Sequence, residues 1–286
     1  MVAALFFGAA LCASGSEIEG SLQLGNFGFA PTRAITDDSF NGTDAFWGGA
    51  LTWRQDISSS IQVETALRRD LIMGNSISAV LQYKSDYFRV AMGPYLGLLN
   101  SSSNILKAGI STLLGAEIPG VAFLRLQTES SLGGQASTSG DYFAQSNGIV
   151  LGFYVRDSAI CGLGLTYKQF AWMQGETELI DSLLEYSFNA QVYEKNVPYR
   201  LNFNAAWQTL LRQAVGGPSQ GLSIIILGAG IDIVISPAFA LLLDFRTSIY
   251  AVGSGVLSGI SAVGFSPFIF QASAGFRVTL ADADAR

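Results

Sequence analysis

The chain has 286 residues, of which 49% are apolar and only 13% are charged, whereas soluble domains carry about 25% charged residues. Its formal net charge of −6 and its lack of histidine argue against nucleic acid as a partner and exclude histidine-based acid–base catalysis and histidine-ligated metal. The sequence also lacks the several uninterrupted apolar stretches of about 20 residues that a helical membrane protein requires.

The N-terminal segment VAALFFGAALCASGS is an apolar run followed by small residues. This order is typical of a secretory signal peptide, so residues 1–16 are predicted to be the signal and residues 17–286 the mature domain. The basic residues that usually precede such a run are missing, and we expect the true start to lie upstream of Met1. A lipoprotein signal ending at Cys12 is the alternative, although Leu11 stands where a small residue is expected.

Short polar connections and longer Gly/Ser/Asp-rich segments alternate along the rest of the chain. Turn-type residues occupy six short links, at 56–60, 84–87, 117–120, 156–159, 194–198 and 235–238. Seven longer loops are predicted at 30–44, 69–75, 98–104, 133–147, 170–181, 209–221 and 251–267. Thirteen connections predict fourteen strands, or twelve if the loop at 69–75 or the strand at 160–169 is misread.

The strands between these connections alternate with a period of two. In YRLNFNAAWQ (199–208), Tyr199 and Phe203 share one face, and Arg200 and Asn202 share the other. FALLLDFRTSIY (239–250) reads the same way, with Phe239, Leu241, Leu243, Phe245 and Ile249 opposite Asp244, Arg246, Ser248 and Tyr250. The apolar face meets either the core of a soluble β-sandwich or the lipid around a membrane barrel.

Charged residues distinguish these two readings. No charge falls well inside a predicted strand on the apolar parity, and a Lys or Arg facing lipid at mid-depth costs about 2–4 kcal/mol. We therefore expect the polar face to enclose an internal lumen. The residues predicted to line it are Arg54, Glu64, Arg68, Arg89, Lys107, Arg125, Glu129, Lys168, Glu185, Arg200, Asp232, Asp244, Arg246 and Arg277.

Aromatic residues near the ends of the apolar faces support the membrane reading. Eight residues separate Tyr199 from Trp207, which is about 20 Å of membrane normal for a strand tilted by roughly 40°. The apolar band of a membrane barrel is about 25 Å tall. The residues predicted to form the lipid-facing girdle are Trp53, Tyr83, Tyr167, Tyr186, Tyr199 and Trp207.

No motif in the sequence indicates a catalytic, metal or cofactor site. The segment IIILGAGIDIVI (224–235) has Gly228 and Gly230 but Ile233 where the dinucleotide fingerprint needs its third glycine. Glu64, Glu129 and Glu185 fall on separate strands with no pairing rule. The acidic stretches at 36–38 and 175–181 are interpreted as solvated surface. We expect no enzyme activity, no metal and no cofactor.

After its first 16 residues, nearly the whole chain resembles bacterial outer-membrane β-barrel proteins. The last strand, FIFQASAGFRVTL, resembles the closing strand that such proteins present to the outer-membrane assembly machinery, although ADADAR follows where the family usually ends on an aromatic residue. Size and strand count resemble small general porins. OmpW-type barrels have eight strands and would leave too many residues unaccounted for. The resemblance implies an all-β fold: a single transmembrane antiparallel up-and-down barrel with short periplasmic turns and longer external loops.

The resemblance also implies a function and a location, the bacterial outer membrane. Our first expectation is a weakly selective channel for passive diffusion of small hydrophilic solutes, with the lipid bilayer, these solutes and the assembly machinery as partners and no nucleic acid. The alternative is a structural or adhesive barrel with a plugged lumen, whose external loops bind a host or surface ligand; residues 209–221 are apolar enough to tuck inside. A transporter of hydrophobic compounds would need an apolar path, and the charged polar parity argues against it.

Overall fold

The computed structural model describes residues 15–26, 46–70, 73–99, 105–132, 142–174, 177–194, 196–215, 217, 219–254, 261–263 and 269–280. Residues 1–14 of the predicted signal, the loop predicted at 30–44 and the C-terminal ADADAR lie outside this set. Within the described ranges, no helix is long and apolar enough to cross a membrane.

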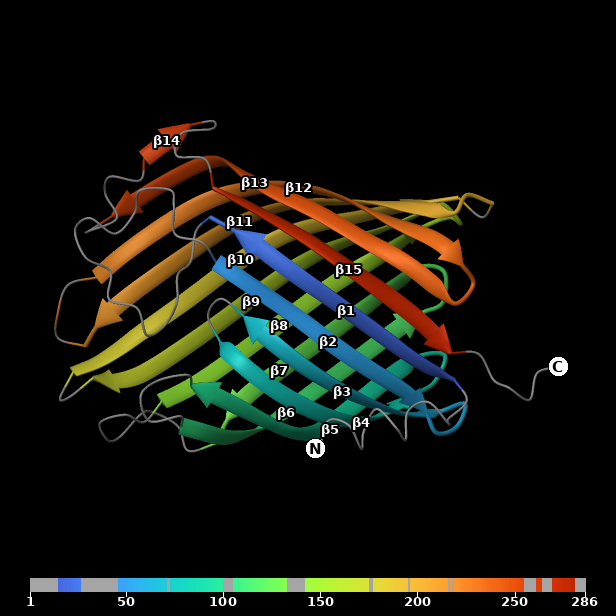
Figure 1. Ribbon diagram of the computed structural model, residues 1–286, viewed down its shortest axis with the longest axis horizontal. Coiled ribbons are helices and arrows are strands. Elements are labelled where there is room, and N and C mark those ends of the chain that lie inside the picture. Colours follow the sequence, from blue (N-terminus) through green and yellow to red (C-terminus); the bar gives the residue numbers. More distant parts are fainter. Residues whose placement is uncertain are drawn as a thin grey trace.

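The chain forms a closed, antiparallel, all-β barrel (Figure 1). Its strands are β1 (Ser16–Gly25), β2 (Phe46–Asp56), β3 (Ile61–Asp70), β4 (Gly74–Lys84), β5 (Phe88–Leu99), β6 (Ile105–Ile118), β7 (Ala122–Ser131), β8 (Tyr142–Val155), β9 (Ala159–Gln174), β10 (Thr177–Tyr193), β11 (Tyr199–Ala214), β12 (Ser219–Ser236), β13 (Phe239–Ser254), β14 (Ser261–Val263) and β15 (Phe270–Leu280). Each strand from β1 to β13 pairs with its neighbours in sequence, β13 pairs with β15, and β15 pairs with β1. The short β14 pairs antiparallel with the loop end of β13, beyond the residues that pair with β15, and adds no strand to the closed barrel. The fourteen-stranded, up-and-down barrel predicted from the sequence is therefore confirmed.

The strands on one side of the barrel are longer than a membrane crossing requires. A tilted membrane strand needs about 9–11 residues, and β9 to β13 have 16, 17, 16, 18 and 16. The excess lies at the end away from the six short turns, which we call the loop end; the opposite end is the turn end. In Figure 1 these long strands reach past their neighbours at the loop end, on the left.

This extension makes two of the predicted loops wrong. Residues 170–181 belong mostly to β9 and β10, and residues 209–221 belong mostly to β11 and β12. The loop predicted at 133–147 also ends earlier, because β8 begins at Tyr142. An outer face in water needs no alternation of apolar and polar residues, so such strand ends carry no sequence signal that separates them from a loop.

A register shift corrects a second prediction. The pairing of β12 with β13 shifts by one residue between Ile225 and Ile226, so that Ile226 faces Ser248 and Ile225 faces Tyr250. Directly opposed residues share a face, and Ile225 is exposed on the outer surface. Tyr250 therefore lies on the outer face and not, as strict alternation predicts, on the face of Ser248.

Strands β4 and β5 approach each other closely at Gly93. Their ladder skips Ala79 and Val80 beside Pro94, which has no backbone N–H to donate. A Cβ added to Gly93 would lie 1.9 Å from the carbonyl oxygen of Ala79 and 2.8 Å from the Cα of Val80. The backbones can pass only because residue 93 has no side chain.

We therefore expect Gly93→Ala to lower the free energy of unfolding by about 1–3 kcal/mol, the usual cost of overpacking. Urea titration in detergent, followed by heat-modifiable gel mobility, measures this change. Gly148→Ala is the matched control, because a Cβ there would approach nothing closer than Thr166 Oγ1 at 3.9 Å. Equal midpoints for the two variants would contradict the close approach.

Candidate functional site: the barrel interior

Ion pairs between strands that are not neighbours identify the interior face. Arg68 on β3 pairs with Glu129 on β7, and Lys168 on β9 pairs with Asp70 on β3. Such side chains can meet only through the inside of a closed barrel. Residues on the parity of Arg68 therefore point inward, and residues on the parity of Leu67, which is 43% exposed, point outward.

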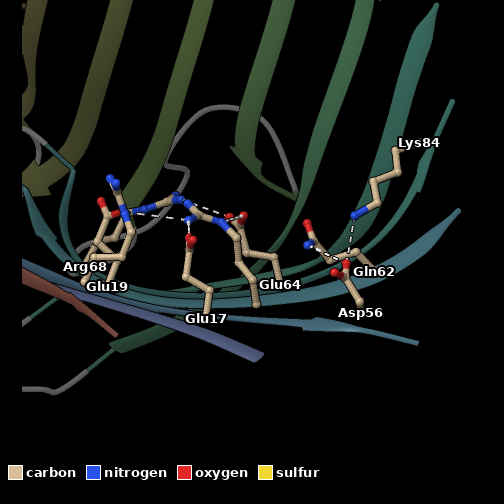
Figure 2. Close-up of polar contacts among 9 residues, drawn as sticks. Glu17, Glu19, Asp56, Gln62, Glu64, Arg68 and Lys84 are labelled. Atoms are coloured by element: carbon tan, nitrogen blue, oxygen red, sulfur yellow. Dashed lines mark hydrogen bonds and ion pairs between the residues drawn. The ribbon is translucent and has the colours of Figure 1, made fainter. Parts of the chain in front are cut away.

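A network of ion pairs follows the inner wall from β15 through β1 and β2 to β3. It links Arg277, Glu19, Arg54, Glu17, Glu64 and Arg68. Arg54 is the register partner of Glu17 on one side and of Glu64 on the other, and its Nε lies 2.9 Å from Glu64 Oε2. Figure 2 shows Glu17, Glu19, Glu64 and Arg68 standing up from the wall into the interior. Cross-strand pairing therefore neutralises much of the basic wall.

The contact from Arg68 to Glu129 passes over strands whose inward residues are small. These inward residues are Ser78 on β4, Gly93 on β5 and Ser111 on β6, which leave room for the long side chains above them. Ser111 Oγ also donates a hydrogen bond to Glu129 Oε1 at 3.4 Å. The contact from Lys168 to Asp70 spans more strands still. These two ion pairs narrow the lumen midway along the barrel.

Above these pairs, toward the loop end, the inward face becomes apolar. We call the following residues the apolar layer, since each has less than 8% of its surface exposed: Met73, Tyr95, Tyr142, Ala144, Phe170, Leu183, Leu210, Leu222, Ile224, Ala251 and Ile269. The rings of Tyr142 and Phe170 stack with their centroids 5.2 Å apart. The expectation of a continuously polar inner face is therefore wrong for the loop half of the barrel.

A buried ion pair lies on the loop side of this layer. Arg212 on β11 donates from Nε to Asp181 Oδ1 at 2.5 Å and from Nη2 to Asp181 Oδ2 at 2.7 Å. The Asp181 side chain is 0% exposed and that of Arg212 is 7% exposed. Sequence reasoning missed this pair because both residues fell in segments predicted to be loops.

The two halves of the barrel interior differ in the residues that line them. A cavity of about 450 Å³ in the turn half has polar lining residues that include Asn189, Gln191, Asn202 and Asn204. A cavity of about 50 Å³ lies in the apolar layer, next to Leu210, Ile224 and Ile269. Among the described residues, the interior is thus polar in the turn half and lined by buried apolar side chains in the loop half.

Apart from Lys107, which is near the loop end of β6, the remaining residues predicted for the lumen lie on inward positions in the turn half or the middle of the barrel. Asp232 accepts a hydrogen bond from Asn202 at 2.8 Å, Glu185 accepts one from Gln208 at 2.5 Å, and Arg246 Nε lies 2.8 Å from Asp244 Oδ1. Lys107 lies opposite Gly97 in the register of β5 and β6.

Three basic residues predicted for the lumen lack the ion pairs that the other basic residues of the turn half form. Among the described residues, no ion pair joins Arg89, Arg125 or Arg200 to an acid. Arg89 and Arg125 are register neighbours of the same residue, Gly115, so two guanidinium groups flank a position without a side chain. The Arg125 guanidinium lies 4.5 Å from the ring centroid of Phe123, which lines the larger cavity.

The predicted girdle residues lie on the outer face. Tyr83, Tyr186, Tyr199 and Trp207 are each about half exposed, and Trp53 and Tyr167 are partly buried on the same face. The rings of Tyr186 and Trp207 stack with their centroids 5.8 Å apart. The same face also carries a cation, Arg69, at the loop end of β3.

The described residues contain no group of three or more His, Cys, Asp or Glu side chains placed to hold a metal ion. The acidic stretch at 36–38 lies outside the described ranges.

Comparison with known proteins places the fold. No family model and no curated protein matches the chain. Among solved structures, an outer-membrane channel from Pseudomonas putida F1 matches with a TM-score of 0.55 at 7% identity, covering 95% of this chain and 97% of that one. A bacterial polysaccharide outer-membrane secretin matches at 0.51 and 7%, covering 93% and 98%. CymD, a monoaromatic hydrocarbon channel, matches at 0.50 and 10%, covering 94% and 90%. The chain is a closed fourteen-stranded barrel, and its fold is similar to that of outer-membrane channels.

Proposed function

We propose that the protein is a narrow, weakly selective channel of the bacterial outer membrane for small hydrophilic solutes. The observation that carries this proposal is the cavity of about 450 Å³ in the turn half, enclosed by a barrel with an apolar outer face and a polar inner one. Barrels of about eight strands are filled by side chains, and barrels of 16–18 strands leave an aqueous channel. Fourteen strands with lumen-crossing ion pairs fit a narrow path. In this proposal the short turns face the periplasm and the loop end faces the outside.

Reconstitution of the purified protein in planar bilayers tests the proposal. Steady conductance steps support a channel, and their size relative to bulk conductivity gives the width of the path. Silence at every voltage, with the protein shown to be folded by heat-modifiable mobility, would overturn it.

A second candidate function is a structural or adhesive barrel that acts through its external loops. The observation that favours it is the apolar layer, whose residues are almost fully buried across the loop half of the lumen. The plug then includes strand residues such as Leu210 and Leu222. The silent outcome of the bilayer experiment supports this candidate.

Arg89 and Arg125 are the basis for a weak anion preference. The other basic groups on inward strand positions of the turn half, with the exception of Arg200, form ion pairs with acids. Arg89 and Arg125 form none among the described residues, so these two add positive charge to the wall. We expect Arg89→Glu combined with Arg125→Glu to shift the reversal potential in a salt gradient toward cations. Arg156→Glu, in the exposed turn before β9, is the control and should leave the potential unchanged. A double variant that keeps the wild-type potential would contradict the assignment.

A further inference from the structure

The outer face of the barrel holds an arginine that contacts no acid. Arg69 is the register partner of Gly49 on β2 and of Asn75 on β4, and it shares the outward parity of Leu67. Its guanidinium lies over the ring of Trp47, 3.9 Å from the centroid. Its Nε donates to the carbonyl oxygen of Trp47 at 3.1 Å, and its Nη1 donates to Asn75 Oδ1 at 3.4 Å. Within the described ranges no ion pair involves Arg69.

An apolar groove of about 430 Å³ lies beside this arginine on the outer surface. Leu51, Leu67, Ile77, Leu96 and Leu106, from five consecutive strands, line it. Trp47, Arg69 and Asn75 form its rim on the side of the loop end. Gly49 lies between the rim and the floor, so no side chain separates the guanidinium from the apolar surface.

The position of the groove matches the edge of a bilayer. Asn75, at the level of Arg69, is eight residues from Tyr83 at the turn end of β4. This separation is about 20 Å along the membrane normal at roughly 3.3 Å per residue and a tilt of about 40°. With Tyr83 at one interface, Arg69 and Trp47 lie near the other interface, and the leucines lie at the depth of acyl chains.

We propose that this groove binds a phosphorylated lipid of the leaflet at the loop end, with its phosphate on Arg69 and an acyl chain along the leucines. A guanidinium at the lipid surface without an acid partner needs an anion, and its fork of donors fits phosphate oxygens. Trp47 and Asn75 hold the side chain in place, which reduces the entropy lost on binding. The site rests on the membrane location proposed above and not on whether the lumen conducts.

Native mass spectrometry of the purified protein in mild detergent tests the site, with diphosphorylated lipid A as the probe. We expect the wild type to retain one lipid A, and Arg69→Gln to weaken its binding about tenfold or more, as for the loss of a charge-assisted hydrogen bond. Arg69→Lys should lose less. Arg156→Gln, an exposed arginine at the turn end, is the matched control and should bind as the wild type does.

Two further binding measurements test whether the affinity comes from the acyl chains alone or from free phosphate alone. Diacylglycerol, which has acyl chains but no phosphate, should bind the wild type and Arg69→Gln equally weakly, and millimolar inorganic phosphate should not displace lipid A. Wild-type affinity in Arg69→Gln, or displacement by phosphate alone, would overturn the lipid site. If Arg69→Gln does not fold, Trp47→Leu makes the same comparison, because it removes the ring that holds the guanidinium. Bilayer conductance of Arg69→Gln should equal that of the wild type, which separates this proposal from the channel.

Discussion

Replacing Asp181 by Asn is expected to lower the free energy of unfolding by about 3–5 kcal/mol, the cost of removing one partner of a buried ion pair. The change leaves the Arg212 guanidinium, whose side chain is only 7% exposed, without the carboxylate that binds it through two hydrogen bonds. Urea titration of the detergent-solubilised protein, followed by heat-modifiable gel mobility, measures the loss.

Two variants provide the controls for this prediction. Asp56→Asn breaks the pair with Lys84, whose side chains are 41% and 29% exposed, and should cost less than about 1 kcal/mol because water screens such a pair. Asp181→Leu with Arg212→Met removes both charges and should restore most of the stability, since apolar residues of similar size often replace a buried pair at little cost. If Asp181→Asn costs no more than Asp56→Asn, the pair is not buried as the structure shows.

Replacing Tyr142 and Phe170 together by Ala is expected to raise the single-channel conductance severalfold. Their stacked rings belong to the apolar layer, in which the described side chains are almost fully buried. A hydrophobic constriction blocks ions by excluding water, so removing two aromatic rings should let water, and therefore ions, pass. Planar bilayer recordings of the double variant measure the change.

Phe188→Ala is the matched control, because Phe188 is a large apolar residue on the outer face, 44% exposed. Its removal should leave conductance unchanged. Gel mobility must show that each variant is folded, since a buried Phe→Ala change alone costs about 3–5 kcal/mol. A folded double variant that conducts no better than the wild type would show that the layer does not limit passage and would favour the plugged barrel.

The alternation of side chains was sufficient to predict the strands and their two faces in the membrane half of the barrel. In residues 199–208, Tyr199 and Phe203 lie on the opposite strand face from Arg200 and Asn202, because a charged side chain in lipid costs several kcal/mol. That penalty acts on each residue by itself, so it is visible in a single strand without knowledge of its neighbours. The six short turns and the count of fourteen strands followed from a different signal, the turn-type residues between the strands.

The partners of the charged residues could not be predicted in the same way. Arg68 and Glu129 are 61 residues apart, and Lys168 and Asp70 are 98 apart. Their contacts depend on the register and closure of the whole barrel. The shift between Ile225 and Ile226 likewise reversed the face of Tyr250, because one unpaired residue inverts a period of two.

The sequence alone determined an all-β barrel with an apolar outer face, since contact with lipid selects against charge at each outward position separately. Only the tertiary structure showed that the loop half of the interior is filled by Phe170, Leu210 and Ile224. In a barrel that projects beyond a bilayer, the outer face of the projecting part meets water, and its inner face meets side chains from across the barrel. The same alternation of residues therefore indicates different surroundings at different positions along the barrel axis. The position of a residue along that axis depends on how the whole barrel closes and cannot be inferred from one strand.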